Sequence, residues 1–300
     1  MKVLYILGRG RSGSTILANV LGEVPGFFSA GELRVLWDPV IARNAPCGCG
    51  VVVTECPLWS VVLSRLRDVD PSDVARWQHE IVRESNIFRL LRKDASDWHT
   101  LQDYARVTNR LYKEIQDVTG CSVIIDSSKR PSYGAFLRLL EDGDPYYVHL
   151  ARDPRASAYS WQSRRHESIH GDEVKQRNAV DSTVRWNLLN IGSEVLLKRV
   201  GSDHGAHLRY EDFVARPRAT VQELCDLVGT GSVELPFLDD RTVELGPNHT
   251  IAGNPSRFST GRLEIRDTQE WKTKQDATSR WLATAVALPF LRRYRYRVRV

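Results

Sequence analysis

The sequence predicts an α/β fold in which helices cover both faces of a mostly parallel β-sheet. Short, unbroken apolar runs suit strands that are buried on both faces. Between these runs, apolar residues recur at every third or fourth position, which is typical of helices packed on a core. Because strands and helices alternate along the chain, we expect a three-layer αβα sandwich built as a single domain of residues 1–300.

The expected elements follow one another in a regular order. A strand at 3–7 runs into glycines, and a short second strand near 27–30 returns the chain to the same edge of the sheet. Further strands are expected at 121–126, 146–151 and 206–209. Helical spacing covers 180–200, 220–228 and 269–286. Asp153-Pro154 after the fourth strand is typical of a helix start.

The segment 37–119 does not show this alternation. After a cysteine-containing loop it has helical patterns at 72–91 and 97–118. No linker rich in proline and glycine separates it from the rest, so an independent domain is disfavoured. We expect a helical insertion that lies over the active edge of the sheet.

The net charge is concentrated at one end of the chain. The sequence has 42 Lys and Arg against 37 Asp and Glu, a net charge of +5, and five arginines fall within its last nine residues. Without them the chain is charge-balanced, which disfavours a nucleic-acid binder with a basic face. In the basic tail, 289–300, arginines alternate with tyrosine and valine. This period of two predicts an edge strand, with a docking arm for an acidic partner or a membrane surface as the alternative.

Two further features concern the cellular setting. No apolar run approaches the ~18 residues that cross a bilayer, and the N-terminal apolar run is too short for a secretory signal, so we expect a soluble cytosolic protein.

The five cysteines do not indicate a disulfide framework. Cys47, Cys49 and Cys56 would supply three ligands of a zinc site, but zinc takes four and the nearest histidine in sequence is His79. We therefore expect a loop without metal.

The first loop has the residues of an anion-binding turn. Residues 8–15, GRGRSGST, fit the spacing G-x-x-x-x-G-x-[ST] between a strand and a helix, which presents backbone N–H groups to an anion. The fold is thus expected to be P-loop-like. The lysine position of a P-loop NTPase is taken by Ser14, which counts against a kinase or NTPase. Arg9 and Arg11 instead offer guanidinium groups to phosphate or sulfate oxygens.

With these residues the chain resembles the sulfotransferases that use 3′-phosphoadenosine 5′-phosphosulfate (PAPS). Arg11-Ser12-Gly13-Ser14-Thr15 stands where that family has its 5′-phosphosulfate loop. The arginine is more similar to the carbohydrate, tyrosylprotein and bacterial branches than to the cytosolic aryl branch. The resemblance implies that PAPS is the sulfuryl donor and that these five residues and Arg9 bind it.

Two later segments extend the resemblance. Arg152 at a strand end and Ser160 eight positions on match the pair that holds the 3′-phosphate in this family. The segment 246–271 is similar to the loop that closes over the nucleotide, and its glycines and prolines suit a lid. The resemblance makes Arg257 and Arg262 candidate ligands of the 3′-phosphate.

The resemblance also implies candidate catalytic groups. Glu32, just after the second strand, is the preferred base, although Ser29-x-x-Glu32 also fits a helix capping box. The rival bases are histidines, with His249 ahead of His149, His166 and His170. Lys129 is the preferred cation beside Arg11, with a solvent-facing loop lysine as its alternative, and Asp126 and Ser128 are candidates to orient it.

The implied reaction is transfer of the sulfuryl group from PAPS to a hydroxyl of a small molecule or carbohydrate, leaving 3′,5′-ADP and requiring no metal. The insertion 37–119 would then cap the acceptor side. Two alternatives stay open: a P-loop kinase or NTPase with Asp126 as its Mg²⁺ ligand, and a non-catalytic nucleotide or sulfate binder. The acceptor and the oligomeric state, a homodimer included, are undetermined.

Overall fold

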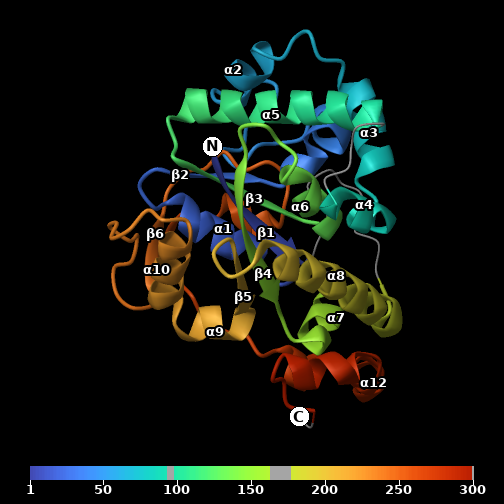
Figure 1. The fold of residues 1–300 in the computed structure, drawn as a ribbon. Coiled ribbons are helices and arrows are strands. Elements are labelled where there is room, and N and C mark those ends of the chain that lie inside the picture. The colour runs from blue at the N-terminus through green and yellow to red at the C-terminus, as the bar shows by residue number, and fades with distance from the viewer. Residues whose placement is uncertain (93–97, 163–176, 299–300) are drawn as a thin grey trace.

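Five parallel strands form the centre of the molecule. The structure, a computed structural model, describes residues 1–92, 98–162 and 177–298. The strand order is β2-β3-β1-β4-β5, and each neighbouring pair is parallel. The strands are β1 (Lys2–Gly8), β2 (Phe27–Gly31), β3 (Val123–Lys129), β4 (Asp144–Ala151) and β5 (Gly205–Arg209). Helices flank this sheet in Figure 1, so the predicted α/β fold is confirmed.

Both faces of the sheet are buried, which explains the unbroken apolar runs. Along the central strand β1, Tyr5 and Leu7 enter one hydrophobic core, whereas Leu4 and Ile6 enter the core on the opposite face. Successive side chains of a strand point to opposite faces, so a strand between two helical layers must be apolar at every position.

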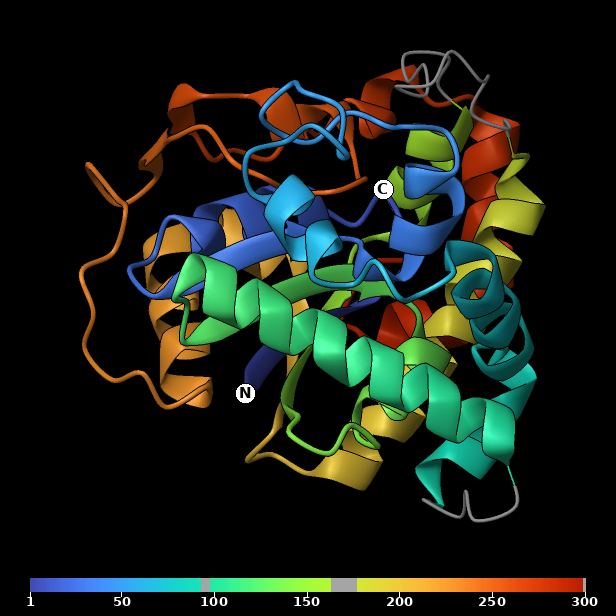
Figure 2. The same cartoon turned by 90° about the horizontal axis from the view of Figure 1, so that it is seen from above.

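One helical layer is formed by segments that follow β1 and β5. It contains α1 (Ser14–Gly22), α9 (Tyr210–Ala215) and α10 (Pro217–Leu227). The antiparallel pair of β6 (Thr242–Leu245) and β7 (Gly261–Glu264) packs beside them. The opposite face is covered by α5 (His99–Thr119), α6 (Pro131–Leu137) and α8 (Ala179–Val200). Figure 2 shows α5 crossing the sheet from one side to the other.

The expected helical insertion is helical, but most of it lies elsewhere than expected. Its helices are α2 (Trp59–Ser64), α3 (Pro71–Ile81), η3 (Glu84–Asn86), α4 (Ile87–Leu91) and α5. The amphipathic helix α5 buries Leu111, Tyr112 and Ile115 against the sheet, so it is part of the sandwich itself. Of the described residues in 37–119, only Pro39 and Val40 line the large cavity at the carboxyl end of the sheet. From this part of the chain, η2 (Leu36–Ile41) supplies cavity-lining residues, as does η1 (Leu33–Val35) just before the insertion, and the cap on the acceptor side stays a prediction.

The prediction of an edge strand in the basic tail is wrong. After α11 (Trp271–Lys274), α12 (Ala277–Arg293) continues into the tail and packs on α8 and on α7 (Pro154–Gln162). A turn follows, with Arg295 at φ 57°. Tyr294 and Tyr296 are buried, and the described arginines of the tail are exposed. The alternation of tyrosine and arginine therefore follows the alternation of buried and exposed side chains, although the segment is not a strand.

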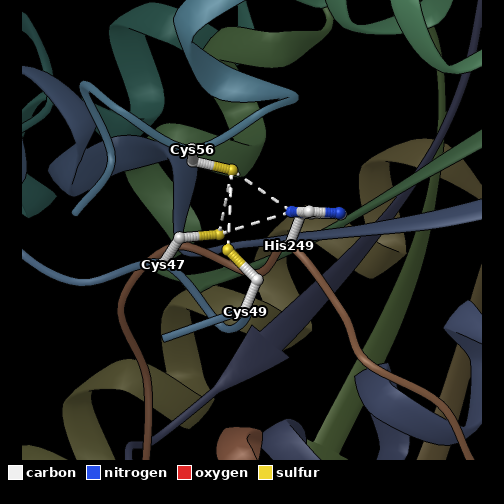
Figure 3. A group of neighbouring side chains, drawn as sticks. All are labelled: Cys47, Cys49, Cys56 and His249. Carbon is white, nitrogen blue, oxygen red and sulfur yellow. Dashed lines mark hydrogen bonds between the residues drawn. The ribbon is translucent and has the colours of Figure 1, made fainter. Parts of the chain in front are cut away.

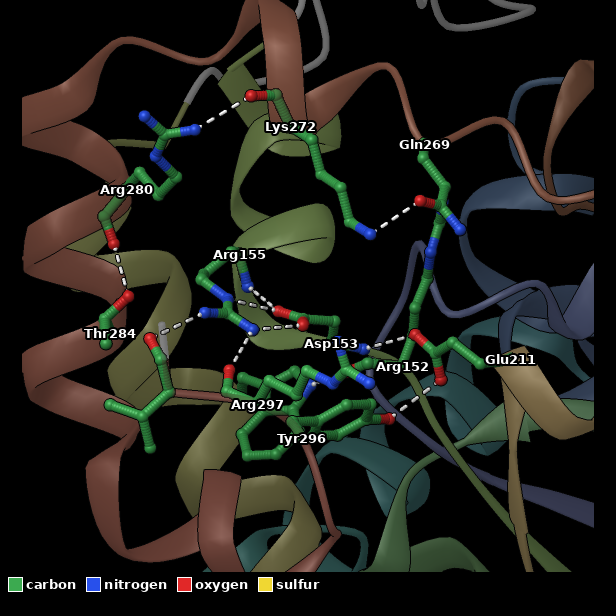
Figure 4. A network of polar contacts seen from close by, with 12 residues as sticks. Arg152, Asp153, Arg155, Glu211, Gln269, Lys272, Arg280, Thr284, Tyr296 and Arg297 are labelled. Atoms are coloured by element: carbon green, nitrogen blue, oxygen red, sulfur yellow. Dashed lines mark hydrogen bonds and ion pairs between the residues drawn. The ribbon is translucent and has the colours of Figure 1, made fainter. Parts of the chain in front are cut away.

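The carbonyl groups of the tail bind a buried arginine. Arg155 is 2% exposed and pairs with Asp153 at 2.6 Å. Its guanidinium also donates to the backbone oxygens of Arg297 (2.8 Å) and Val298 (3.3 Å). Tyr296 donates to Glu211 at 3.0 Å, as Figure 4 shows. These contacts use the carbonyl groups that a strand would pair with a neighbouring strand. Arg299 and Val300 lie outside the described residues. In the part of the chain that the structure describes, no helix is both long and apolar enough to span a bilayer.

Candidate active site

A cavity of about 650 Å³ lies at the carboxyl end of the sheet. Parallel α/β sheets bind ligands at this edge because several strands deliver their ends to one place. The walls are the loop 8–15 after β1, Glu32 and Arg34 after β2, 128–130 after β3, Arg152 after β4, Ser160 and Trp161 of α7, and 252–257. The predicted donor-site residues other than Arg262 and Ser12 are among these lining residues.

Two glycines hold the loop 8–15 against its neighbours. Gly8 has φ 135°, and a Cβ there would stand 2.3 Å from the carbonyl oxygen of Leu150. Gly13 has φ 89° and precedes α1, and a Cβ there would stand 2.3 Å from the Tyr210 ring. Ser12 is 1% exposed, and its hydroxyl has no partner among the described residues. The loop therefore presents unpaired donors at a helix N-terminus, the usual arrangement for binding an anion.

The arginines of the loop are held by an aromatic ring. The guanidinium carbons of Arg9 and Arg11 lie 4.5 and 5.3 Å from the centre of Trp161. Trp161 in turn donates its indole N–H to the carbonyl of Gly10 at 3.2 Å. Burial, reinforced by the nearby Arg177, lowers the pKa of Arg9 to about 10. Clustered, desolvated cations are stabilised by an anion between them.

Several guanidinium nitrogens of the cavity are buried without a partner in the described chain. They are Nε and Nη2 of Arg9, Nε of Arg34 and Nε of Arg257. Arg152 lies 4.5 Å from the centre of the Tyr210 ring and donates to the carbonyl of Arg11 at 3.3 Å. Buried donors of this kind cost free energy unless a ligand pairs with them. The residues present thus fit a ligand that carries several anionic oxygens.

Glu32 and Lys129 meet in the cavity. The Lys129 ammonium lies 2.6 Å from a Glu32 carboxylate oxygen, and their side chains are 13% and 21% exposed. Lys129 also donates to the carbonyl of Ser127 at 2.7 Å. The capping-box alternative for Glu32 is wrong, because Ser29 lies inside β2 and not at a helix N-terminus, and its hydroxyl has no partner among the described residues. The solvent-facing alternative for Lys129 is wrong as well.

Asp126 supports the end of β3 from behind. It is 0% exposed, and one carboxylate oxygen accepts from the backbone N–H (2.8 Å) and hydroxyl (2.5 Å) of Ser128. The other oxygen accepts from the Tyr112 hydroxyl at 2.5 Å. Burial raises the pKa of Asp126 to about 6. Because both oxygens are engaged and Asp126 does not line the cavity, it is poorly placed to bind Mg²⁺.

None of the described rival histidines reaches the cavity. His149 is 0% exposed and bonds to Asn190 at 2.6 Å, and burial lowers its pKa to about 3. His249 faces the cysteine loop. His166 and His170 lie outside the described residues.

The two lid arginines have different surroundings. Arg257 is 2% exposed, lines the cavity and donates to the carbonyl of Pro46 at 2.8 Å. Arg262 lies on β7 with 79% of its side chain exposed, pairs with Glu244 at 3.5 Å and does not line the cavity.

Sequence reasoning missed Arg34, Trp161 and the position of His249. Arg34 stands two residues after the proposed base, and Trp161 directly follows Ser160. Their proximity to motif residues was a usable signal, since residues at strand and helix ends share one edge of the sheet. No local signal linked His249 to the cysteines.

Comparisons with known proteins identify a family and a similar fold. A family model described as the sulfotransferase family matches residues 4–233. The sulfotransferase domain from the curacin biosynthetic pathway has a similar structure, with a TM-score of 0.55, 17% identity and coverage of 99% of this chain and 98% of that one. The sulfotransferase domain of the Synechococcus PCC 7002 olefin synthase is also similar, with a TM-score of 0.54 and 21% identity. The match covers 97% of this chain and 94% of that one. At these identities the likeness shows the fold. No match was found among curated proteins.

Proposed function

The chain belongs to the sulfotransferase family, and on that premise we propose that it transfers the sulfuryl group of PAPS to a hydroxyl of a small-molecule or carbohydrate acceptor. The new bond joins the acceptor oxygen to sulfur, and the bond between sulfur and the 5′-phosphate oxygen breaks, which releases 3′,5′-ADP. The observation that carries the proposal is the Glu32–Lys129 pair, 2.6 Å apart, in a cavity walled by an anion-binding loop.

We assign the donor to the cations and the loop. The backbone N–H groups of residues 12–15 and the guanidinium of Arg11 would bind the 5′-phosphosulfate. The unpaired N–H groups of Arg9 and Arg34 would add donors to these oxygens. Arg152 and Ser160, which line the same cavity, are assigned to the 3′-phosphate.

Glu32 and Lys129 are assigned the two halves of the chemistry. The Glu32 carboxylate accepts the proton of the acceptor hydroxyl as that oxygen attacks sulfur. Lys129 stabilises negative charge on the sulfuryl oxygens and on the departing 5′-phosphate, in a site that excludes much of the solvent. An acceptor that enters the cavity would lie next to the Glu32 carboxylate. The Lys129 ammonium would then leave this carboxylate and turn toward the sulfuryl donor.

The alternatives gain no support from the site. A kinase or NTPase would need a cation at the position of Ser14 and a metal ligand that the buried Asp126 does not provide. A non-catalytic binder would leave the Glu32–Lys129 pair without a role. We also propose a cytosolic location, supported by the five free cysteines.

The proposal is tested by thermal unfolding with 3′,5′-ADP, with ATP and Mg²⁺, or with neither. A ligand at ~100 times its Kd stabilises the folded state by about 2.7 kcal/mol. We expect stabilisation by 3′,5′-ADP, followed by PAPS-dependent sulfation when hydroxyl-bearing acceptors are screened. Stabilisation by ATP and Mg²⁺ alone would refute the assignment.

A further inference from the structure

Three cysteines of the loop after η2 converge at one point with His249, which belongs to the segment 246–271. Figure 3 shows Cys47, Cys49, Cys56 and His249 turned toward one another. The Cys56 sulfur lies 3.6 Å from that of Cys47 and 3.7 Å from that of Cys49. Nδ1 of His249 lies 3.2 Å from the Cys56 sulfur and 3.8 Å from the Cys47 sulfur. The sequence-based objection to zinc, the lack of a fourth ligand, therefore does not hold.

The spacing of these atoms matches a tetrahedral metal site. Zn–S bonds of about 2.3 Å at tetrahedral angles place sulfurs about 3.8 Å apart, and a Zn–N bond of about 2.05 Å places nitrogen about 3.6 Å from each sulfur. All four ligand atoms lie within 4.8 Å of one another. We propose that these four residues bind one structural Zn²⁺ ion. With four protein ligands the site is closed, unlike a catalytic zinc site, which keeps one position open.

The backbone around the cysteines is arranged for this convergence. The N–H of Gly50 donates to the carbonyl of Cys47 at 2.9 Å, and Gly50 has φ 86°. The chain therefore turns tightly over residues 47–51, which carry the first two thiols. The buried Trp59 donates its indole N–H to the carbonyl of His249 at 2.7 Å. Hydrogen bonds of this kind hold ligand-bearing segments in position.

A glycine allows the histidine segment to approach the loop. The N–H of Gly48 donates to the carbonyl of Thr250 at 2.9 Å. A Cβ at Gly48 would stand 2.0 Å from the Asn248 side-chain oxygen. The two segments thus contact each other through the backbone bond at Thr250 and through the Asn248 side chain, on the two sides of His249.

The charge around the cluster suits the bound ion. Three thiolates, one Zn²⁺ and a neutral imidazole sum to −1. Arg257, 2% exposed, forms no ion pair with a carboxylate within the described chain and interacts electrostatically with Cys47. Its guanidinium donates to the carbonyl of Pro46, the residue before that cysteine. A buried guanidinium beside a metal cluster of net charge −1 gains the opposite charge that its burial requires.

A disulfide is the competing fate of these thiols. It would pair two of the three cysteines and leave the third thiol and the imidazole without a role. A soft donor set of three sulfurs and one nitrogen instead matches zinc and other thiophilic metals.

The zinc ion would hold the segment 246–271 in place beside Glu32, the candidate base. Two residues after His249, Ile251 exchanges backbone hydrogen bonds with Ala30 (3.0 Å) and Glu32 (2.9 Å). The N–H of Asn254 then donates to the Thr15 hydroxyl at 3.3 Å. Removal of the metal should therefore weaken 3′,5′-ADP binding and lower the stability of the fold. The effect on 3′,5′-ADP binding rests on the proposed function, whereas the measured metal content does not depend on it.

The test is elemental analysis of the full chain purified without chelator, together with the variants Cys49→Ser and His249→Ala. Cys121→Ser, which removes a buried cysteine outside the cluster, is the matched control. We expect about one zinc per chain in the wild type and the control, and loss of that zinc in both cluster variants. His249→Cys should retain it through a fourth sulfur. Should a cluster variant fail to fold, Co²⁺ bound by the wild type should give the visible absorption of tetrahedral thiolate ligation.

Four results would overturn the proposal. One is a folded wild type that contains no zinc and takes up neither added Zn²⁺ nor Co²⁺. Another is one zinc per chain in the Cys49→Ser/His249→Ala double variant, which would place the metal elsewhere. Iron or copper in place of zinc, or a thiol titration that finds a disulfide among the three cysteines, would refute the assignment of the ion.

Discussion

Glu32→Gln separates catalysis from binding at the candidate site. The change keeps the shape of the side chain and removes its charge. Loss of a general base lowers transfer by about 10²- to 10⁴-fold, or about 2.7–5.4 kcal/mol at 1.36 kcal/mol per factor of ten. The variant also leaves Lys129, 13% exposed, without its carboxylate partner. For a half-buried pair this costs about 1–2 kcal/mol of folding stability, between the values for exposed and buried ion pairs.

The effect on nucleotide binding has the opposite sign. Two like unit charges ~8 Å apart repel by about 2 kcal/mol at an effective dielectric of about 20, so removing the Glu32 charge can only lower the repulsion of a bound anion. The Kd for 3′,5′-ADP should therefore stay the same or decrease. Calorimetric titration and a PAPS-dependent transfer assay measure the two quantities on one preparation. Glu244→Gln, in an exposed ion pair away from the cavity, is the control. Unchanged turnover, or a Kd that rises in proportion to the loss of turnover, would refute the role of Glu32.

Three further predictions concern the loop, the unpaired arginine and the buried histidine. Gly13→Ala should abolish 3′,5′-ADP binding, because its Cβ would collide with the Tyr210 ring, whereas Gly120→Ala, also at positive φ but with nothing within 4 Å, should only cost about 1 kcal/mol of stability. Arg34→Gln should raise the KM for PAPS about tenfold or more, because a charged hydrogen bond contributes about 1.5–3 kcal/mol. Arg262→Gln should leave the KM for PAPS unchanged. Equal effects of the two variants would contradict the assigned donor site. The depressed pKa of His149, about 3, implies that its contribution to stability is complete above pH 6.5 and declines as the pH falls, with about 2 kcal/mol lost at pH 5. Urea unfolding at pH 7 and pH 5 should therefore show a smaller loss in His149→Gln than in the wild type or in His204→Gln, whose histidine is 44% exposed.

Much of the candidate site could be predicted because it lies at the ends of parallel strands. The loop 8–15, Glu32, Lys129 and Arg152 each follow a strand, and strands of one parallel sheet bring their carboxyl ends to one edge. The apolar runs that indicate these strands are local patterns. Assigning the right residues to strand ends was therefore enough to group the candidate donor and base residues, although Arg11 and Arg152 are 141 positions apart.

Other features depended on the packing of segments with no local signature. The tail pattern RRYRYRVRV was compatible with a strand, but Arg155 binds its carbonyl groups and the chain turns instead. Helix α5 was expected in a cap, but its apolar stripe is buried on the sheet. Periodicity shows that one face of a segment is buried and does not show which surface covers it.

By itself, the sequence determined the α/β fold, the candidate anion-binding loop and the strand ends that carry the candidate base and cations, because each depends on residues close together in the chain. Only the tertiary structure decided that Glu32 pairs with Lys129, and that His249 joins Cys56 from 193 positions away. The reason is physical: a metal site or an ion pair requires side-chain atoms to meet within a few ångströms, and long-range packing sets those distances.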